Sequence, residues 1–193
     1  MTKQASNYFW LQIGRLLFFS SLFLGCNTND VDTKTNLVFR YNEHKNIGSL
    51  DPAFAKDNAD ISAINQLFNG LVQMDSLMNV VPAIASSWEI SENAKTYTFD
   101  LRKDVYFHTH SLFGTNQTRS VTANDFAYSF DRLKDPKLAS PGGWVLQNVE
   151  SYTALDAQRF QITLKSPFPA FLGLLSMKYC SVVPKEIVEH YGA

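Results

Sequence analysis

The stretch from Ser87 to Leu133 constrains the fold of this chain more than any other. Apolar and polar residues alternate over positions 96–101, and the alternation resumes over 104–108 after a Lys-Asp turn. A period of two is typical of strands that bury one face, so this stretch predicts two neighbouring half-buried strands. Neither strand carries residues arranged for catalysis.

A helix is predicted directly after these strands, over 122–133. Thr122 can cap its first N–H groups, and Asp125 stands in the position that completes a capping box. The apolar residues behind this cap recur at helical spacing, at Phe126, Phe130 and Leu133.

The remaining periodic segments complete a mixed α/β pattern. Further strands are predicted at 37–41, 71–74 and 159–164. A helix fits 60–68, with Ile61, Ile64, Leu67 and Phe68 on one face and Gly70 as its C-terminal cap. Two short helices are predicted to begin after Ser166 and at Val183. Pro184 would occupy the first helical position of the second one. We expect the strands at 96–101, 104–108 and 159–164 to pair in one sheet under the 122–133 helix.

Composition narrows the function classes. The chain has 193 residues, 45% hydrophobic and 18% charged, which suffices for one or two domains with a real core. Its net charge of −1, without a basic block, gives no electrostatic footprint for nucleic acid. The sequence has no nucleophile-elbow, P-loop or dinucleotide motif, and no cofactor is implied.

His108 and His110 are the best candidates for chemistry, because alternate residues of a strand place both rings on one face. No third ligand is set by spacing, so we expect no metal site. His108 is then a strand-end residue and His110 an exposed loop residue.

The N-terminus has the features of a targeting segment. An apolar run over 16–24, too short to span a bilayer, follows Lys3 and Arg15 and ends at Gly25-Cys26. This ending is similar to the lipobox of bacterial lipoproteins, in which the Cys is lipidated and becomes the mature N-terminus. An ordinary secretory signal with a chance Cys is the alternative.

The lipobox divides the start of the chain into a signal peptide, 1–25, and a polar tether, 26–36, with Cys26 as the lipidation site. Cys180 is then the only remaining thiol. Its apolar neighbours predict a buried small hydrophobe and not a catalytic nucleophile.

Four motifs follow one another in the central stretch: Ser-Trp, Tyr-Thr-Phe-x-Leu-Arg, Val-x-Phe-His and Val-Thr-Ala-x-Asp-Phe-x-x-Ser-x-x-Arg. Their residues are Ser87, Trp88, Tyr97, Thr98, Phe99, Leu101, Arg102, Val105, Phe107, His108, Val121, Thr122, Ala123, Asp125, Phe126, Ser129 and Arg132. This order resembles the signature of the extracellular solute-binding proteins of peptide/nickel-type ABC transporters (family 5). Supporting matches lie at 50–52, Asp57, 67–72, 167–172 and 183–186.

The resemblance implies a periplasmic-binding-protein-like α/β fold. A small α/β subdomain, 71–166, would be inserted into a first lobe begun by 37–70 and resumed by 167–193. Family members are much longer, so we expect an N-terminal fragment that lacks the other lobe and the acidic residue with which peptide-binding relatives hold the ligand's amino terminus. The polar stretch 109–120 would replace a tight Asp-Gly turn of the family.

The implied function is that of a monomeric, lipid-anchored, non-enzymatic protein of the periplasm or cell envelope. It would capture oligopeptides or a similar small solute for an ABC permease; nickel, haem and sugar binders share the same motifs. A secreted lipoprotein hydrolase and a surface interaction module are the alternatives.

Family geometry places the ligand between the lobes, which implies contacts from connections in this chain. The expected ligand-binding residues are Lys56, Asp57, Asn58, Pro141, Gly142 and Trp144. Peptide-binding members often have an aromatic residue after the Ser-Pro, where this chain has Gly142. Trp144 would supply the stacking surface instead, unless it is the hydrophobic anchor of an irregular loop over 135–144.

Overall fold

The computed structural model describes residues 40–43 and 45–192, and the helices and strands of this described part all follow Glu43. The predicted signal peptide, Cys26, the tether and residues 37–39 lie outside the described residues. Arg40 and Tyr41 form no strand. None of the helices in the described part is long and apolar enough to cross a membrane.

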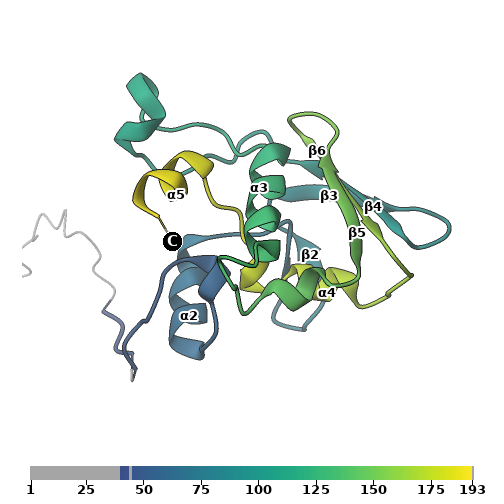
Figure 1. Ribbon diagram of the computed structural model, residues 1–193, viewed down its shortest axis with the longest axis horizontal. Coiled ribbons are helices and arrows are strands. Elements are labelled where there is room, and N and C mark those ends of the chain that lie inside the picture. The colour runs from purple at the N-terminus through teal and green to yellow at the C-terminus, as the bar shows by residue number, and fades with distance from the viewer. Residues whose placement is uncertain (1–39, 44, 193) are drawn as a thin grey trace, which may run out of the picture. The chain divides into compact units, whose positions relative to one another are not determined.

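A four-stranded antiparallel sheet forms the centre of the part of the chain that follows Glu43 (Figure 1). Its strands lie in the order β3 (Ala85–Ile90), β4 (Thr96–Leu101), β6 (Arg159–Leu164) and β5 (Val149–Ala154). In the β4–β6 pair, Tyr97 lies opposite Ile162 and Phe99 opposite Phe160, and all four side chains are buried. The strands predicted at 96–101 and 159–164, and their pairing, are confirmed.

Helix α3 (Ala123–Lys134) covers one face of this sheet (Figure 1). The Asp125 carboxylate accepts hydrogen bonds from the Thr122 backbone N–H at 2.8 Å and hydroxyl at 2.9 Å, and the predicted capping box is present. Phe126 and Phe130 are fully buried, with ring centroids 5.8 Å and 5.5 Å from that of Phe160. Burial of each ring contributes roughly 2–3 kcal/mol, so these contacts fix the helix on the sheet.

The strand predicted over 104–108 is wrong. Both edges of β4 are already occupied, by β3 and by β6, so this segment has no free strand beside it. It hydrogen-bonds instead to the residues just before α3: the Phe107 N–H donates to the Arg119 carbonyl, and the Val121 N–H donates to the Val105 carbonyl. The only strand-like pairing there is an isolated bridge between Tyr106 and Ser120.

Three of the observed strands were not predicted from the sequence, and a fourth was predicted one residue too long. The structure adds β3 and β5 to the central sheet. A separate two-stranded sheet contains β1 (Val72–Met74), which shortens the predicted strand at 71–74, and β2 (Val80–Pro82).

Helix α2 (Asn58–Leu67) confirms the predicted helix but not its buried face or its end. The helix buries Ala59, Asp60 and Ile64. Ile61 and Leu67 are exposed, because the Asp60 carboxylate turns inward to accept the Gly48 and Ser49 N–H groups. Gly70 does not cap the helix: the chain is already extended at Phe68.

Short helical turns complete the unit. They are η2 (Pro52–Phe54), η3 (Ser111–Asn116), η4 (Gly143–Leu146), α4 (Phe171–Leu175), η5 (Lys178–Cys180) and α5 (Lys185–Tyr191). The two predicted short helices are present but begin later than expected: α4 begins at Phe171 and not directly after Ser166, and Pro184 precedes α5 as its N-cap.

Candidate functional site

The segment before α2 is held to the central helix by a charge pair. Arg132 of α3 donates two hydrogen bonds to Asp51, at 3.0 Å and 2.5 Å, and the Arg132 side chain is only 9% exposed. The same Asp51 carboxylate accepts the Ala53 N–H at 3.0 Å and so caps η2. One carboxylate therefore fixes both the direction of the segment and its first helical turn.

The two stretches predicted to touch ligand are adjacent. The Ser140 hydroxyl donates a 2.6 Å hydrogen bond to the Ala53 carbonyl, which joins the loop after α3 to the segment that leads to Lys56. Ser140 also accepts the Gly142 N–H at 3.1 Å. Residues 56–58 and 141–144 are thus supported by one hydrogen-bonded connection.

Residues 56–58 differ in what they can offer a ligand. Lys56 and Asn58 are exposed. Asp57 is engaged: its carboxylate caps α2 by accepting the Asp60 N–H at 3.2 Å and pairs with Lys45 at 2.5 Å. The hydrogen bond from Lys45 holds the pKa of Asp57 below its usual value, so the carboxylate is already paired within the chain.

The predicted ligand residues of the loop, Pro141, Gly142 and Trp144, also differ in how exposed they are. Pro141 is exposed, and Trp144 is 52% exposed. Val145 and Leu146, not Trp144, are the buried anchors of this loop. Gly142 is buried, and a Cβ atom there would lie 2.3 Å from the Tyr179 ring. An aromatic side chain at position 142 has no room, which explains the glycine in physical terms.

Turn η5 is a part of this region that sequence reasoning missed. It contacts η2 and α2, and its Tyr179 rests on Gly142. Cys180 is buried in the core, where desolvation raises the pKa of its thiol to about 12. The predicted burial of Cys180 among apolar neighbours is confirmed.

A second polar feature lies between α3 and α5. Arg119 donates hydrogen bonds to both Asp125 oxygens, at 2.9 Å and 2.7 Å, and to both Glu186 oxygens, each at 2.7 Å. Partial burial lowers the pKa of Arg119, but the hydrogen bonds to the two carboxylates outweigh this effect and raise it. The hydrogen bond from Arg119 in turn lowers the pKa of Glu186. A cavity of about 400 Å³ adjoins the cluster, lined also by Thr122, Asn124, Tyr128, Lys185 and Glu189. None of the predicted ligand residues lines it.

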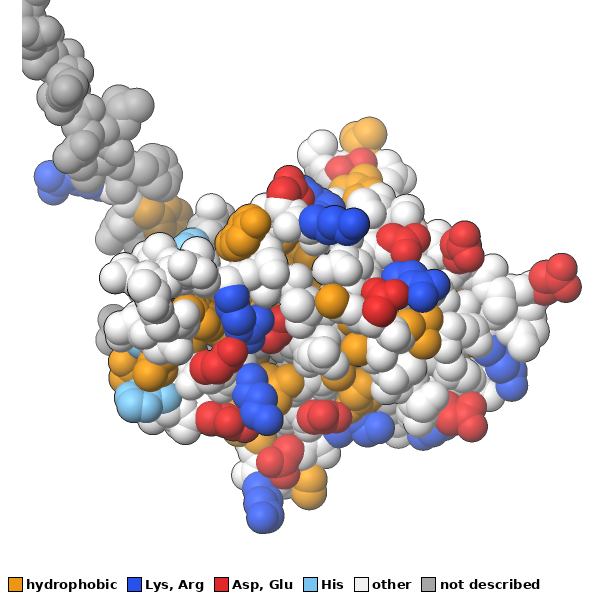
Figure 2. Space-filling view, turned by 90° about the horizontal axis from the view of Figure 1, so that it is seen from above, with side chains coloured by type: hydrophobic (Ala, Val, Ile, Leu, Met, Phe, Trp, Pro, Cys, Tyr) orange, Lys and Arg blue, Asp and Glu red, His pale blue; other side chains and the backbone are white. Residues whose placement is uncertain are grey.

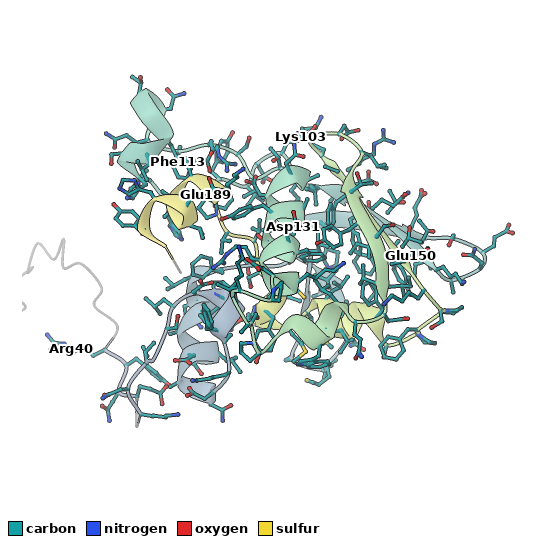
Figure 3. All side chains as sticks on the ribbon, in the orientation of Figure 1. Arg40, Lys103, Phe113, Asp131, Glu150 and Glu189 are labelled. Atoms are coloured by element: carbon teal, nitrogen blue, oxygen red, sulfur yellow. The ribbon has the colours of Figure 1, made fainter. Side chains whose placement is uncertain are left out.

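The stretch 109–120 is docked on α5 through this cluster. The Arg119 guanidinium lies over the rings of Phe107 and Phe113, and η3 contacts α5 (Figures 1 and 3, with Phe113 and Glu189 labelled in the latter). His110 is half-buried, not exposed as predicted, because its ring caps η3 and meets Tyr191 edge-on.

His108 is exposed and belongs to no strand. Within residues 40–43 and 45–192, no group of three or more His, Cys, Asp or Glu is placed to hold a metal ion. The face in Figure 2 shows acidic and basic side chains interspersed, without a continuous patch of one sign.

Residues 79–190, more than half of the chain, match the family described as bacterial extracellular solute-binding proteins, family 5 Middle. The chain therefore belongs to the family 5 extracellular solute-binding proteins, as its motifs predicted.

Individual relatives agree with this assignment. The chain is 32% identical over 184 residues to the probable deoxycholate-binding periplasmic protein YgiS of Escherichia coli, covering 84% of this chain and 33% of that protein. It is 33% identical over 168 residues to the periplasmic oligopeptide-binding protein OppA of Salmonella typhimurium, covering 78% of this chain and 29% of that one. The chain thus spans about a third of the length of these relatives.

The fold has a counterpart among solved structures. Haemophilus influenzae OppA in complex with the peptide RPPGFSPFR superposes with a TM-score of 0.66 at 30% identity, over 75% of this chain and 30% of that one. The predicted mixed α/β, periplasmic-binding-protein-like fold is confirmed. The subdomain boundaries at 71 and 166 stay predictions.

Proposed function

We propose that this chain is part of the solute-binding component of an ABC importer that takes up oligopeptides or a similar small solute. The observation that carries the proposal is the likeness, in both fold and sequence, to OppA crystallised with a bound peptide. Such a protein acts by binding and release without covalent chemistry. A hydrolase receives no support, because the relatives named above are binding proteins.

The ligand would lie against the surface formed by residues 56–58 and 141–144. Both stretches are connections on a rigid scaffold, where binding residues concentrate. The exposed Trp144 ring can cover apolar ligand surface at low cost in conformational entropy. Main-chain hydrogen bonds would supply affinity for a peptide, and roomy side-chain pockets would tolerate different sequences.

The mechanism would be closure of two lobes around the solute by a hinge motion. In this scheme the described residues supply one side of the cleft, and a permease receives the solute when the cleft reopens. The protein would act as a monomer in the periplasm or cell envelope.

Lipidation at Cys26 would keep the protein near its permease. Support comes from the sequence alone: an apolar run that ends at Gly25-Cys26. A Cys26→Ala variant should be released from membranes. If this variant stays in the membrane pellet and the wild-type signal is also uncleaved, the anchor proposal is wrong.

The direct test is native mass spectrometry of the full-length protein, expressed from its complete gene and purified without refolding. The expected result is a co-purified peptide or other small solute. Calorimetry with tri-alanine, a mixed oligopeptide pool and deoxycholate then separates the two ligand classes named for the relatives. The proposal fails if no solute is retained and none of these probes binds.

A further inference from the structure

Turn η5 brings an uncommitted cation into the ligand region. η5 contacts η2 and α2, the elements that lie before and after Lys56 and Asp57, and its Tyr179 rests on Gly142 of the other predicted stretch. This turn therefore lies where the two stretches meet.

Lys178 is the residue of this turn that is neither fully buried nor packed on Gly142. A 3₁₀ turn has about three residues per revolution, so its three side chains point in three directions. Tyr179 covers Gly142, and the buried Cys180 lies with its Sγ 3.8 Å from the Leu174 carbonyl oxygen. Lys178 begins the turn that contacts η2, and it is half-buried.

The Lys178 backbone carbonyl accepts the Ser181 N–H, but its ammonium group has no hydrogen-bond or ion-pair partner in the described part of the chain. A charged group that gives up hydration without a partner loses free energy, so half-buried ammonium groups are normally paired. Burial also lowers the pKa of Lys178, which a nearby carboxylate would reverse.

The acidic residues of the same region are already occupied. Asp51 binds Arg132, Asp57 binds Lys45, and Asp60 accepts the Gly48 and Ser49 N–H groups. Lys56, exposed next to Asp57, likewise has no such partner among the described residues. The region therefore offers a ligand uncompensated positive charge.

We propose that Lys178 recognises a carboxylate of the bound solute, assisted by the field of Lys56, and so selects solutes that carry this group. The inference rests on the proposed function and narrows its substrate class. The carboxylate can be the C-terminus of a peptide, an acidic side chain or the acid group of another small solute. The shared chemistry is a charge-assisted hydrogen bond from the ammonium group.

The test uses the full-length protein and calorimetry with two pairs of probes. Tri-alanine and its C-terminal amide test a terminal carboxylate; Ala-Glu-Ala amide and Ala-Gln-Ala amide test a side-chain carboxylate. We expect wild type to prefer the acid of one pair by about tenfold or more. Lys178→Met, which keeps the aliphatic stem, should abolish that preference and leave binding of the neutral probe within about twofold.

Two variants control for indirect effects. Lys178→Arg keeps the positive charge and should retain the preference for the acid probe, even if the different shape of the guanidinium makes that preference smaller. Lys103→Met removes an exposed lysine of the β4–α3 connection and should behave as wild type (Figure 3). Unfolding curves verify that each variant is folded.

The outcomes separate the two proposals. If wild type binds the probes but Lys178→Met keeps the acid preference, or wild type shows none, the role of Lys178 is refuted and the solute-binding function stands. If wild type binds no peptide, deoxycholate or co-purified solute, the function itself is refuted, and the inference with it.

Discussion

Asp51 and Arg132, 81 positions apart in the chain, form a two-hydrogen-bond ion pair that joins the segment before α2 to the central helix. Arg132 is nearly buried, and Asp51 also caps η2. This pair positions the stretch that leads to Lys56, Asp57 and Asn58. The candidate site thus depends on a charge in the last turn of a helix that otherwise serves the core.

Replacement of Arg132 by Met should destabilise the protein by about 3 kcal/mol, because it leaves the Asp51 carboxylate partly buried without its counter-ion. Urea unfolding at neutral pH measures this. Arg102→Met is the matched control, since the Arg102–Asp104 pair is exposed at 49% and 72% and should contribute less than about 0.5 kcal/mol. Equal losses in the two variants would show that burial of the Asp51 pair has no energetic role.

The Glu186–Arg119 pair should give a pH-dependent stability. The hydrogen bond from Arg119 lowers the folded-state pKa of Glu186. The contribution of Glu186 to the free energy of unfolding is therefore present above the usual Glu pKa and is lost as the pH falls through the folded-state pKa. Glu186 is 44% exposed, which limits this contribution to about 1 kcal/mol or less.

Unfolding of wild type and Glu186→Gln should therefore differ at pH 7 and converge as the pH falls below the usual Glu value. Glu150→Gln, at an exposed position of β5, should follow wild type throughout. A gap that widens on acidification would have the wrong sign for this mechanism.

Gly142→Ala should destabilise the protein by roughly 1–3 kcal/mol, the range for overpacking, because the new Cβ would lie 2.3 Å from the Tyr179 ring. Gly173→Ala is the control: its Cβ meets Met74 at an ordinary 3.5 Å, and alanine is the better helix former within α4. Thermal unfolding of the two variants compares their losses of stability. Adding Tyr179→Ala to Gly142→Ala should cost less than the sum of the single changes, since the clash is then gone.

Trp144→Ala should weaken solute binding by the full-length protein by roughly 1–3 kcal/mol, the range for the loss of one anchor residue. The 52% exposure of Trp144 means that stability should change little. Calorimetry with the native solute measures the affinity, and Tyr106→Ala, another exposed aromatic, should leave it unchanged. Unaltered affinity in a folded Trp144→Ala protein would remove Trp144 from the site.

Part of the site was foreseeable and part was not. Residues 56–58 and 141–144 were named from a family resemblance, and the Ser140–Ala53 hydrogen bond makes these stretches adjacent. No sequence pattern pointed to Lys178, because a three-residue turn has no period. The position of this turn beside Gly142 depends on contacts distant in sequence. The exposure of Trp144 could not be read from the loop composition, which also fits a buried anchor.

The sequence by itself determined β4, β6 and α3, because alternation and a capping box are local signals that act within a few residues. Only the tertiary structure decided which alternating segments became strands. Residues 104–108 have the pattern but no free neighbour, whereas β3 and β5 have weaker patterns and pair at the edges that remain. Strand pairing and the docking of η5 depend on which groups the rest of the chain leaves unpaired, and that is a property of the whole fold.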